Sequence, residues 1–198
     1  GKRNGYAKVR MVTDSTVQVL DSWHNTVPVR HFYRSSDRPY LWIATEQGLV
    51  VYNEQTKRRR VFDESAGINN SYIYGILPEN DSVLWVSTNK GLTRVCAHFV
   101  PGDSVYVSVR NYTSKDGLQS NEFNTGAFFK SADGVMLFGG IAGVNWFDPG
   151  KIQANPYVAR PAITGVYVDD TLMVRDTTMN LKRLELPFNK NTISITYR

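Results

Sequence analysis

Cysteine is almost absent from the sequence. Cys96 is the single cysteine among 198 residues, so the chain cannot form an internal disulfide. It lies in an apolar run between Leu92 and Val100, and we expect a small buried side chain there. A lone cysteine fits either the cytoplasm or the periplasm, so it does not decide the compartment.

Long apolar stretches are also missing. No run approaches the ~20 apolar residues that a membrane-spanning helix needs, and the N-terminus lacks the charged-then-apolar pattern of a signal peptide. Helical patterns are few, whereas aromatic and β-branched residues are frequent and 15 glycines are present. This combination predicts an all-β protein. The repeats described below indicate a piece of a longer protein that begins inside a repeating unit.

Charge of one sign is only weakly in excess. The chain has 23 basic and 18 acidic residues, a formal net charge of +5. Its one dense basic run is Lys57-Arg58-Arg59-Arg60. We expect a solvated outer strand here, where charge prevents edge-to-edge aggregation of sheets; a phosphate- or sulfate-binding patch is the alternative. We predict no nucleic acid partner, because one short run is not an extended basic surface.

Catalytic and metal-binding patterns are not found either. The three histidines, His24, His31 and His98, have no cysteine, histidine or carboxylate at metal-ligand spacing. Acidic residues such as Asp103 and Asp116 could in principle act as a pair in glycoside chemistry, but most occupy turn positions, which Asp favours anyway. We therefore predict no catalytic residue, no metal and no cofactor in this chain.

What is present is one short stretch that occurs three times. It reads LWIATEQGL at 41–49, LWVSTNKGL at 84–92 and, in degenerate form, MLFGGIAGV at 136–144. Each copy is an apolar strand, a polar turn closed by glycine, and the start of a second apolar strand. Gly48 and Gly91 are 43 residues apart, and another glycine lies 43 residues before Gly48. A period of roughly 40–45 residues is typical of the four-stranded blades of a β-propeller.

The repeats divide residues 1–150 into blades. We predict two complete blades, at 24–66 and 67–116, between the back half of one blade (1–23) and a third blade that ends early (117–150). The prolines and glycine that follow predict a linker at 151–161. Trp42, in the apolar register of its strand, should be a core residue between adjacent blades.

Residues 162–198 have a different pattern of short alternating strands with turns between them. The predicted strands are 162–168, 171–174, 184–186 and 192–197. They resemble the opening of an immunoglobulin-like sandwich, which needs ~100 residues and is therefore incomplete here. The predicted fold class is all-β: a partial β-propeller of four-stranded antiparallel blades, followed by the beginning of an Ig-like β-sandwich.

Candidate binding residues lie in loops that share one face of a propeller. Amide and charged side chains of this kind can bind sugar hydroxyls through paired hydrogen bonds. The alternative is that each residue only forms its turn. The candidates are Glu46, Gln47, Asn69, Asn70, Asn89, Lys90 and Asn121.

Three motifs carry a family resemblance. LWIATEQGLVVYN and LWVSTNKGLTRV resemble the propeller repeat of bacterial two-component regulators. Residues 116–152 are similar to the closing blade of that propeller, and PFNKNTISITYR (187–198) to the start of the Ig-like, tyrosine-rich domain that follows it. The order of the three motifs is that of the extracytoplasmic sensor of hybrid two-component histidine kinases.

The resemblance implies a periplasmic segment of an inner-membrane protein that senses oligosaccharides and signals to a cytoplasmic histidine kinase. The segment itself would not be an enzyme. The alternatives are a propeller scaffold that docks proteins without a small ligand, and an enzyme propeller such as a lyase or glycosidase. The expected partners are an oligosaccharide, the other blades and Ig-like domain of the parent, and further copies of the chain, through blade faces that an incomplete ring leaves open.

Overall fold

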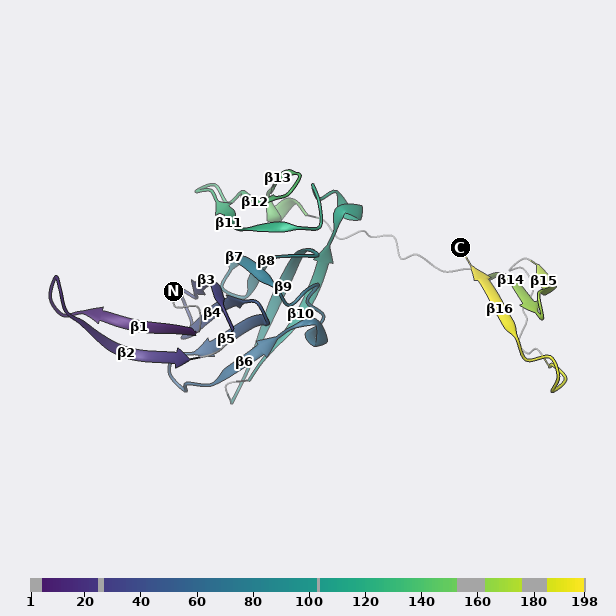
Figure 1. The fold of residues 1–198 in the computed structure, drawn as a ribbon, viewed down its shortest axis with the longest axis horizontal. Coiled ribbons are helices and arrows are strands. Elements are labelled where there is room, and N and C mark those ends of the chain that lie inside the picture. Colours follow the sequence, from purple (N-terminus) through teal and green to yellow (C-terminus); the bar gives the residue numbers. More distant parts are fainter. Residues whose placement is uncertain (1–4, 25–26, 103, 153–162, 176–184, 198) are drawn as a thin grey trace. The chain divides into compact units, whose positions relative to one another are not determined.

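The computed structural model describes residues 5–24, 27–102, 104–152, 163–175 and 185–197. Within these ranges every regular element is a β-strand or a three-residue 3₁₀ turn, and there is no α-helix. The prediction of an all-β chain is therefore confirmed. The chain divides into two compact units, residues 1–152 and 153–198. The strands of each unit are labelled in Figure 1.

Two four-stranded antiparallel sheets form the centre of the first unit. Their strand orders are β3-β4-β5-β6 and β10-β9-β8-β7, so each is a simple meander. The strands of the first are β3 (Val29–Arg34), β4 (Tyr40–Thr45), β5 (Gly48–Asn53) and β6 (Arg59–Phe62). Those of the second are β7 (Ile73–Asn80), β8 (Val83–Thr88), β9 (Gly91–Val100) and β10 (Ser104–Tyr112).

Smaller sheets lie at both ends of this pair in the sequence. The strands β1 (Gly5–Met11) and β2 (Val17–His24) form an antiparallel hairpin. A three-stranded sheet contains β11 (Phe123–Lys130), β12 (Met136–Gly140) and β13 (Gly143–Phe147). The chain then enters the 3₁₀ turn η3 (Pro149–Lys151), and no fourth strand joins β13 among the described residues.

The glycine-closed turns repeat in atomic detail. The Thr45 hydroxyl donates to the Gly48 carbonyl at 2.7 Å, and the Thr88 hydroxyl donates to the Gly91 carbonyl at 2.9 Å. Both glycines have positive φ, +120° and +114°, a conformation that side chains with a Cβ rarely adopt. The two glycines, 43 residues apart in the sequence, therefore close turns of the same geometry.

Apolar side chains are sandwiched between successive sheets. Trp42 is 0% exposed, in a cluster that includes Ile73 and Val95 of the next sheet, which confirms its predicted place in the core. Trp85 belongs to a second cluster, shared with Phe138 of the three-stranded sheet. A third cluster joins the first sheet to the β1–β2 hairpin. Each four-stranded sheet thus buries both of its faces, which requires apolar residues at successive positions of its strands.

The second unit contains one three-stranded antiparallel sheet of order β15-β14-β16. Its strands are β14 (Ile163–Val168), β15 (Thr171–Arg175) and β16 (Ile193–Tyr197). The predicted strand at 184–186 is wrong for Glu185 and Leu186, which lie in no strand, and Leu184 falls outside the described residues. Of the predicted linker, Lys151 and Ile152 belong to the first unit, and 153–161 fall outside the described residues.

Candidate functional site

The predicted binding residues occupy corresponding turns of successive sheets. Glu46 and Gln47 form the β4–β5 turn, and Asn89 and Lys90 form the β8–β9 turn. Asn69 and Asn70 precede β7, after the 3₁₀ turn η1 (Glu64–Ala66). Asn121 precedes β11, after the equivalent turn η2 (Ser114–Asp116).

Two tyrosines, Tyr72 just before β7 and Tyr74 within it, connect three of these turns. The Tyr72 hydroxyl donates to Glu46 Oε1 at 2.9 Å, and the Tyr74 hydroxyl donates to Asn89 Oδ1 at 2.6 Å. The two rings lie with their centroids 4.9 Å apart at 52°. Asn70 Oδ1 accepts from the backbone N–H of Tyr72 at 3.1 Å. A continuous polar and aromatic surface therefore runs from the β4–β5 turn to the β8–β9 turn.

Arg30 of β3 completes this surface. Its guanidinium donates to Glu46 Oε1 and lies over the Tyr72 ring, 5.4 Å from the centroid. We call the five residues Arg30, Glu46, Tyr72, Tyr74 and Asn89 the tyrosine cluster. All are partly or fully accessible to solvent, with the Arg30 and Glu46 side chains 30% and 25% exposed.

The charges of the tyrosine cluster favour neutral phenols beside an ion pair. Burial, and then the hydrogen bond to Glu46, raises the pKa of Tyr72 above its ordinary value. Burial, and then the nearby negative charge of Glu122, raises the pKa of Tyr74. The hydrogen bond to Glu46 raises the pKa of Arg30. Near neutral pH both tyrosines therefore keep their hydroxyl protons and can act as donors.

Asn69 and Asn70 mainly hold the backbone of their own loop. Asn69 Nδ2 donates to the Lys90 carbonyl and so ties this loop to the neighbouring β8–β9 turn. Asn70 Nδ2 donates to Glu64 Oε1 at 3.0 Å. The amide donors of both residues are therefore engaged within the protein, as the turn-forming alternative expects.

The other three candidates differ among themselves. Asn121 Oδ1 accepts from the Ser114 backbone N–H at 2.7 Å, so it holds the η2 turn rather than joining the tyrosine cluster. The side chains of Gln47 and Lys90 are exposed at the tips of their turns, next in sequence to Glu46 and Asn89. Of the seven candidates, the structure thus brings Glu46, Asn70 and Asn89 together through the tyrosines.

The arrangement combines flat aromatic area with hydrogen-bonding groups at its edge. Tyrosine rings offer flat apolar area with a polar hydroxyl, which suits the apolar face of a sugar ring. A carboxylate, an amide and a guanidinium at the edge of the rings offer both donors and acceptors to hydroxyl groups. Within the chain these groups bond to one another.

Sequence reasoning missed Arg30, Tyr72 and Tyr74. The tyrosines alternate with the fully buried Ile73, so the period-two pattern of β7 marks them as facing away from that core. This alternation is visible in the sequence just after the candidate Asn70. Arg30 had no local signal, because its partner Glu46 is reached only through the antiparallel pairing of β3 with β4.

No group of three or more His, Cys, Asp or Glu side chains that could hold a metal occurs among the described residues. No helix in that part of the chain has the length and apolar character to cross a membrane. Two cavities of about 230 and 240 Å³ lie elsewhere, and none of the predicted candidates lines either.

One curated protein is similar in sequence to this chain. It is histidine kinase P4 of Formosa agariphila, 25% identical over 159 residues that cover 76% of this chain. The chain spans 11% of that protein's length. No family model matches the chain. The similarity to a histidine kinase confirms the resemblance that the repeat motifs indicated.

Solved structures with partial similarity are extracellular domains from B. thetaiotaomicron. One, of the proposed hybrid two-component system BT4673, is 19% identical and covers 73% of this chain and 26% of that chain, with a TM-score of 0.42. Another, of the proposed hybrid two-component system BT3049, is 15% identical and covers 91% and 38%, with a TM-score of 0.35.

Proposed function

We propose that this chain is an extracytoplasmic sensor segment of a hybrid two-component signalling protein. It binds an oligosaccharide at the tyrosine cluster and passes the signal to a cytoplasmic histidine kinase. The observation that carries the proposal is the sequence similarity to a histidine kinase over 159 residues. That stretch is 11% of the relative, which leaves most of the relative for other parts such as a kinase.

The fold proposed for the first unit is a set of β-propeller blades. Its support is the repetition of a four-stranded meander with the same glycine-closed turn and a shared core between successive sheets. The fold proposed for the second unit is the opening of an Ig-like sandwich, supported by its three short antiparallel strands. We propose that this segment lies in the periplasm, as part of an inner-membrane protein.

A second candidate function is a scaffold that docks other proteins without a small ligand. It is favoured by apolar side chains exposed on the three-stranded sheet β11-β12-β13. Phe129 is 62% exposed, and Trp146 is 74% exposed. Exposed apolar patches of this kind often mark sites of protein association.

A thermal-shift screen against an oligosaccharide panel separates the two functions. A ligand that binds the native state raises the melting temperature by mass action. The sensor proposal expects at least one oligosaccharide class to give a saturable rise for this chain. The scaffold function expects no response to any sugar, together with association between proteins.

A further inference from the structure

The basic run at residues 57–60 leads into β6, which begins at Arg59. Successive residues of a strand point to opposite faces. Arg59 lies over the rings of Tyr52 and Trp23, 4.8 and 5.4 Å from their centroids. Arg60 lies on the other face of β6 and donates to the Val105 carbonyl, and Arg58, just before the strand, donates to the Gly102 carbonyl.

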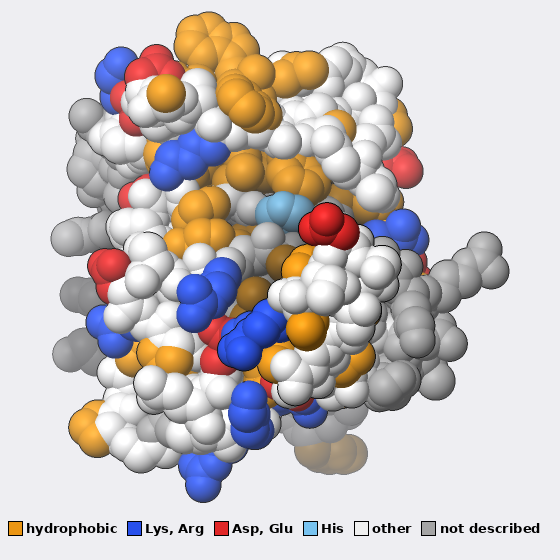
Figure 2. Space-filling view, turned by 90° about the vertical axis from the view of Figure 1, so that its left-hand side faces the viewer, with side chains coloured by type: hydrophobic (Ala, Val, Ile, Leu, Met, Phe, Trp, Pro, Cys, Tyr) orange, Lys and Arg blue, Asp and Glu red, His pale blue; other side chains and the backbone are white. Residues whose placement is uncertain are grey.

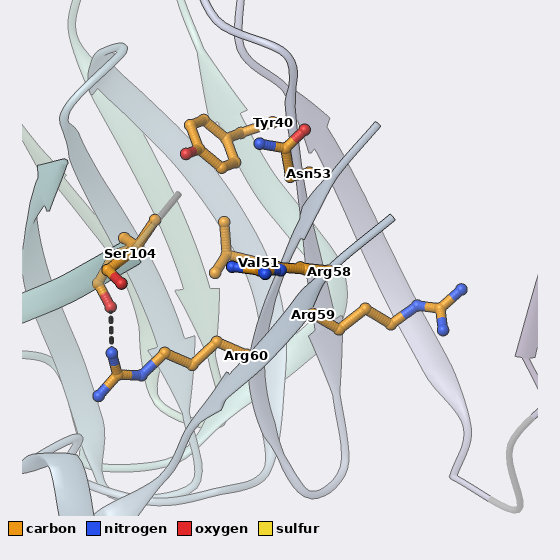
Figure 3. Close-up of a pocket in the computed structure, with 8 residues that line it drawn as sticks. Tyr40, Val51, Asn53, Arg58, Arg59, Arg60 and Ser104 are labelled. Atoms are coloured by element: carbon orange, nitrogen blue, oxygen red, sulfur yellow. Dashed lines mark hydrogen bonds between the residues drawn. The ribbon is translucent and has the colours of Figure 1, made fainter. Parts of the chain in front are cut away.

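Arg58 and Arg60 flank a cavity between the first and second four-stranded sheets. The cavity holds about 230 Å³. In Figure 3, Arg60 reaches toward Ser104 and bonds to the Val105 carbonyl, whereas the guanidinium of Arg59 points away. We name this cavity the arginine cavity. Its lining residues are Tyr40, Val51, Asn53, Arg58, Arg59, Arg60, Ser104 and Val105.

The charge of the arginine cavity is not balanced by its lining. No Asp or Glu of the described residues lines it, and neither Arg58 nor Arg60 forms an ion pair with a described carboxylate. Arg60 donates one N–H to the Val105 carbonyl at 2.6 Å, and Arg58 donates one N–H to the Gly102 carbonyl at 3.4 Å. A guanidinium has five N–H donors in a planar fork, so several remain for another acceptor.

These features point to an oxyanion. Two positively charged guanidinium groups beside a concave wall concentrate the positive potential and attract an anion. Arginine forks match the paired oxygens of sulfate, phosphate and carboxylate groups. The volume is below the roughly 300 Å³ of typical drug-sized sites, which favours one charged group over a long chain of sugar rings.

We propose that the arginine cavity binds an oxyanion group, a sulfate, phosphate or carboxylate carried by a small ligand. The bound anion bridges β6 and β10 and so joins the outer strands of two sheets. This site is separate from the tyrosine cluster. A test of anion binding here therefore does not depend on whether the tyrosine cluster binds a sugar.

The test is a titration of the 198-residue chain with sodium sulfate by calorimetry, at constant ionic strength held with chloride. Inorganic phosphate, glucuronate and a sulfated monosaccharide form parallel arms that identify which carrier is preferred. We expect saturable binding of at least one of them. Because Arg60→Gln removes a charged hydrogen bond to the anion, it should raise the dissociation constant about tenfold or more.

The matched control is Arg110→Gln, which removes the same charge from an exposed residue of β10 that does not line the cavity. We expect it to bind the anion with the affinity of the natural chain. Ser104→Glu keeps both arginines and places a carboxylate at the cavity, so it should abolish anion binding and raise the melting temperature without any anion. Asp103 is adjacent in sequence and falls outside the described residues, so Asp103→Asn is titrated too and should bind at least as tightly.

Circular dichroism checks that each variant is folded. The proposal is overturned if the natural chain binds none of the four anions. It is also overturned if Arg110→Gln weakens binding as much as Arg60→Gln does, because the effect would then be one of net charge alone. Undiminished binding by Ser104→Glu would place the anion elsewhere.

Discussion

Gly91 lies directly against the backbone carbonyl of Tyr112. A Cβ at Gly91 would stand 2.0 Å from the Tyr112 oxygen, and the corresponding distance from Gly48 to the Phe62 oxygen is 2.6 Å. The turn of each sheet thus packs on the last residue of the outer strand of the same sheet. This close approach explains why the two clearest copies of the repeat share a glycine at one position.

Replacing Gly91 by alanine should be strongly destabilising. The change combines a positive φ, which costs about 1–2 kcal/mol with a Cβ, with a clash that the backbone must relieve. Gly143→Ala is the matched control, since Gly143 has φ +135° and no atom within 4 Å of the added Cβ. Urea unfolding should show a clearly larger loss for Gly91→Ala. Equal losses would mean that the close approach is unimportant.

Asp81 should make the stability of the first unit sensitive to acid. Its carboxylate accepts hydrogen bonds from the Tyr33 hydroxyl at 2.7 Å, Ser36 N at 3.0 Å and Asp37 N at 2.8 Å. The Tyr33 bond, above all, holds the pKa of Asp81 far below its usual range. The contacts join the β7–β8 turn to the β3–β4 loop and so connect two sheets.

The sign follows from the lowered pKa. A carboxyl whose pKa is lower in the folded than in the unfolded state stabilises the fold above its unfolded pKa, about 4. This contribution is lost as the pH falls toward the folded pKa. Asp81→Asn should therefore be less stable at pH 7 and lose less stability between pH 5 and 2, measured by thermal unfolding. Asp169→Asn, in the second unit, is the charge-matched control and should keep the acid sensitivity.

The two buried tryptophans should respond differently to the same change. Trp85 Nε1 donates to Glu79 Oε2 at 3.0 Å, and Arg94 holds Glu79 through two bonds of 2.9 Å. Trp42 Nε1 has no hydrogen-bond partner among the described residues. Trp85→Phe should therefore destabilise by about 1 kcal/mol more than Trp42→Phe. Denaturant unfolding tests this, and a larger cost for Trp42→Phe would contradict it.

The isolated chain should self-associate. Val144 and Trp146 alternate on β13 and are 58% and 74% exposed, next to a strand edge that no described strand covers. Figure 2 shows hydrophobic side chains gathered on one face. Val144→Lys with Trp146→Lys should shift light scattering toward monomer, whereas Phe188→Lys, at a residue 96% exposed in the second unit, should not. A natural chain that is monomeric at every concentration would contradict the prediction.

Much of the first unit could be predicted from local chemistry. The sequence pattern predicts strands at 40–45 and 59–62, and β4 and β6 have these bounds. The same pattern predicts an inner strand at 71–77, whereas β7 begins at Ile73, because the Asn70 side chain engages the backbone N–H of Tyr72. The strand expected at 184–186 rested on two leucines alone, without a turn signal or a pairing partner.

The candidate site was less predictable, because its contacts are long-range. Asn70 and Asn121 look alike in sequence, yet one contacts Tyr72 and the other holds Ser114. Arg30 meets Tyr72 across 42 residues of sequence. Turn composition identifies residues that can bond, whereas strand pairing decides which of them meet.

The tyrosine cluster is the proposed binding site for an oligosaccharide. The most direct measurement is the ligand-dependent melting temperature of this chain and of Tyr72→Ala with Tyr74→Ala, across the same oligosaccharide panel. The matched control is Tyr106→Ala, which removes a ring that is 50% exposed on β10, outside the cluster. We expect a saturable rise in melting temperature for the natural chain and the control, and the loss of that rise in the double variant. A rise that survives in the double variant would contradict oligosaccharide binding at the tyrosine cluster, as would no rise for any sugar.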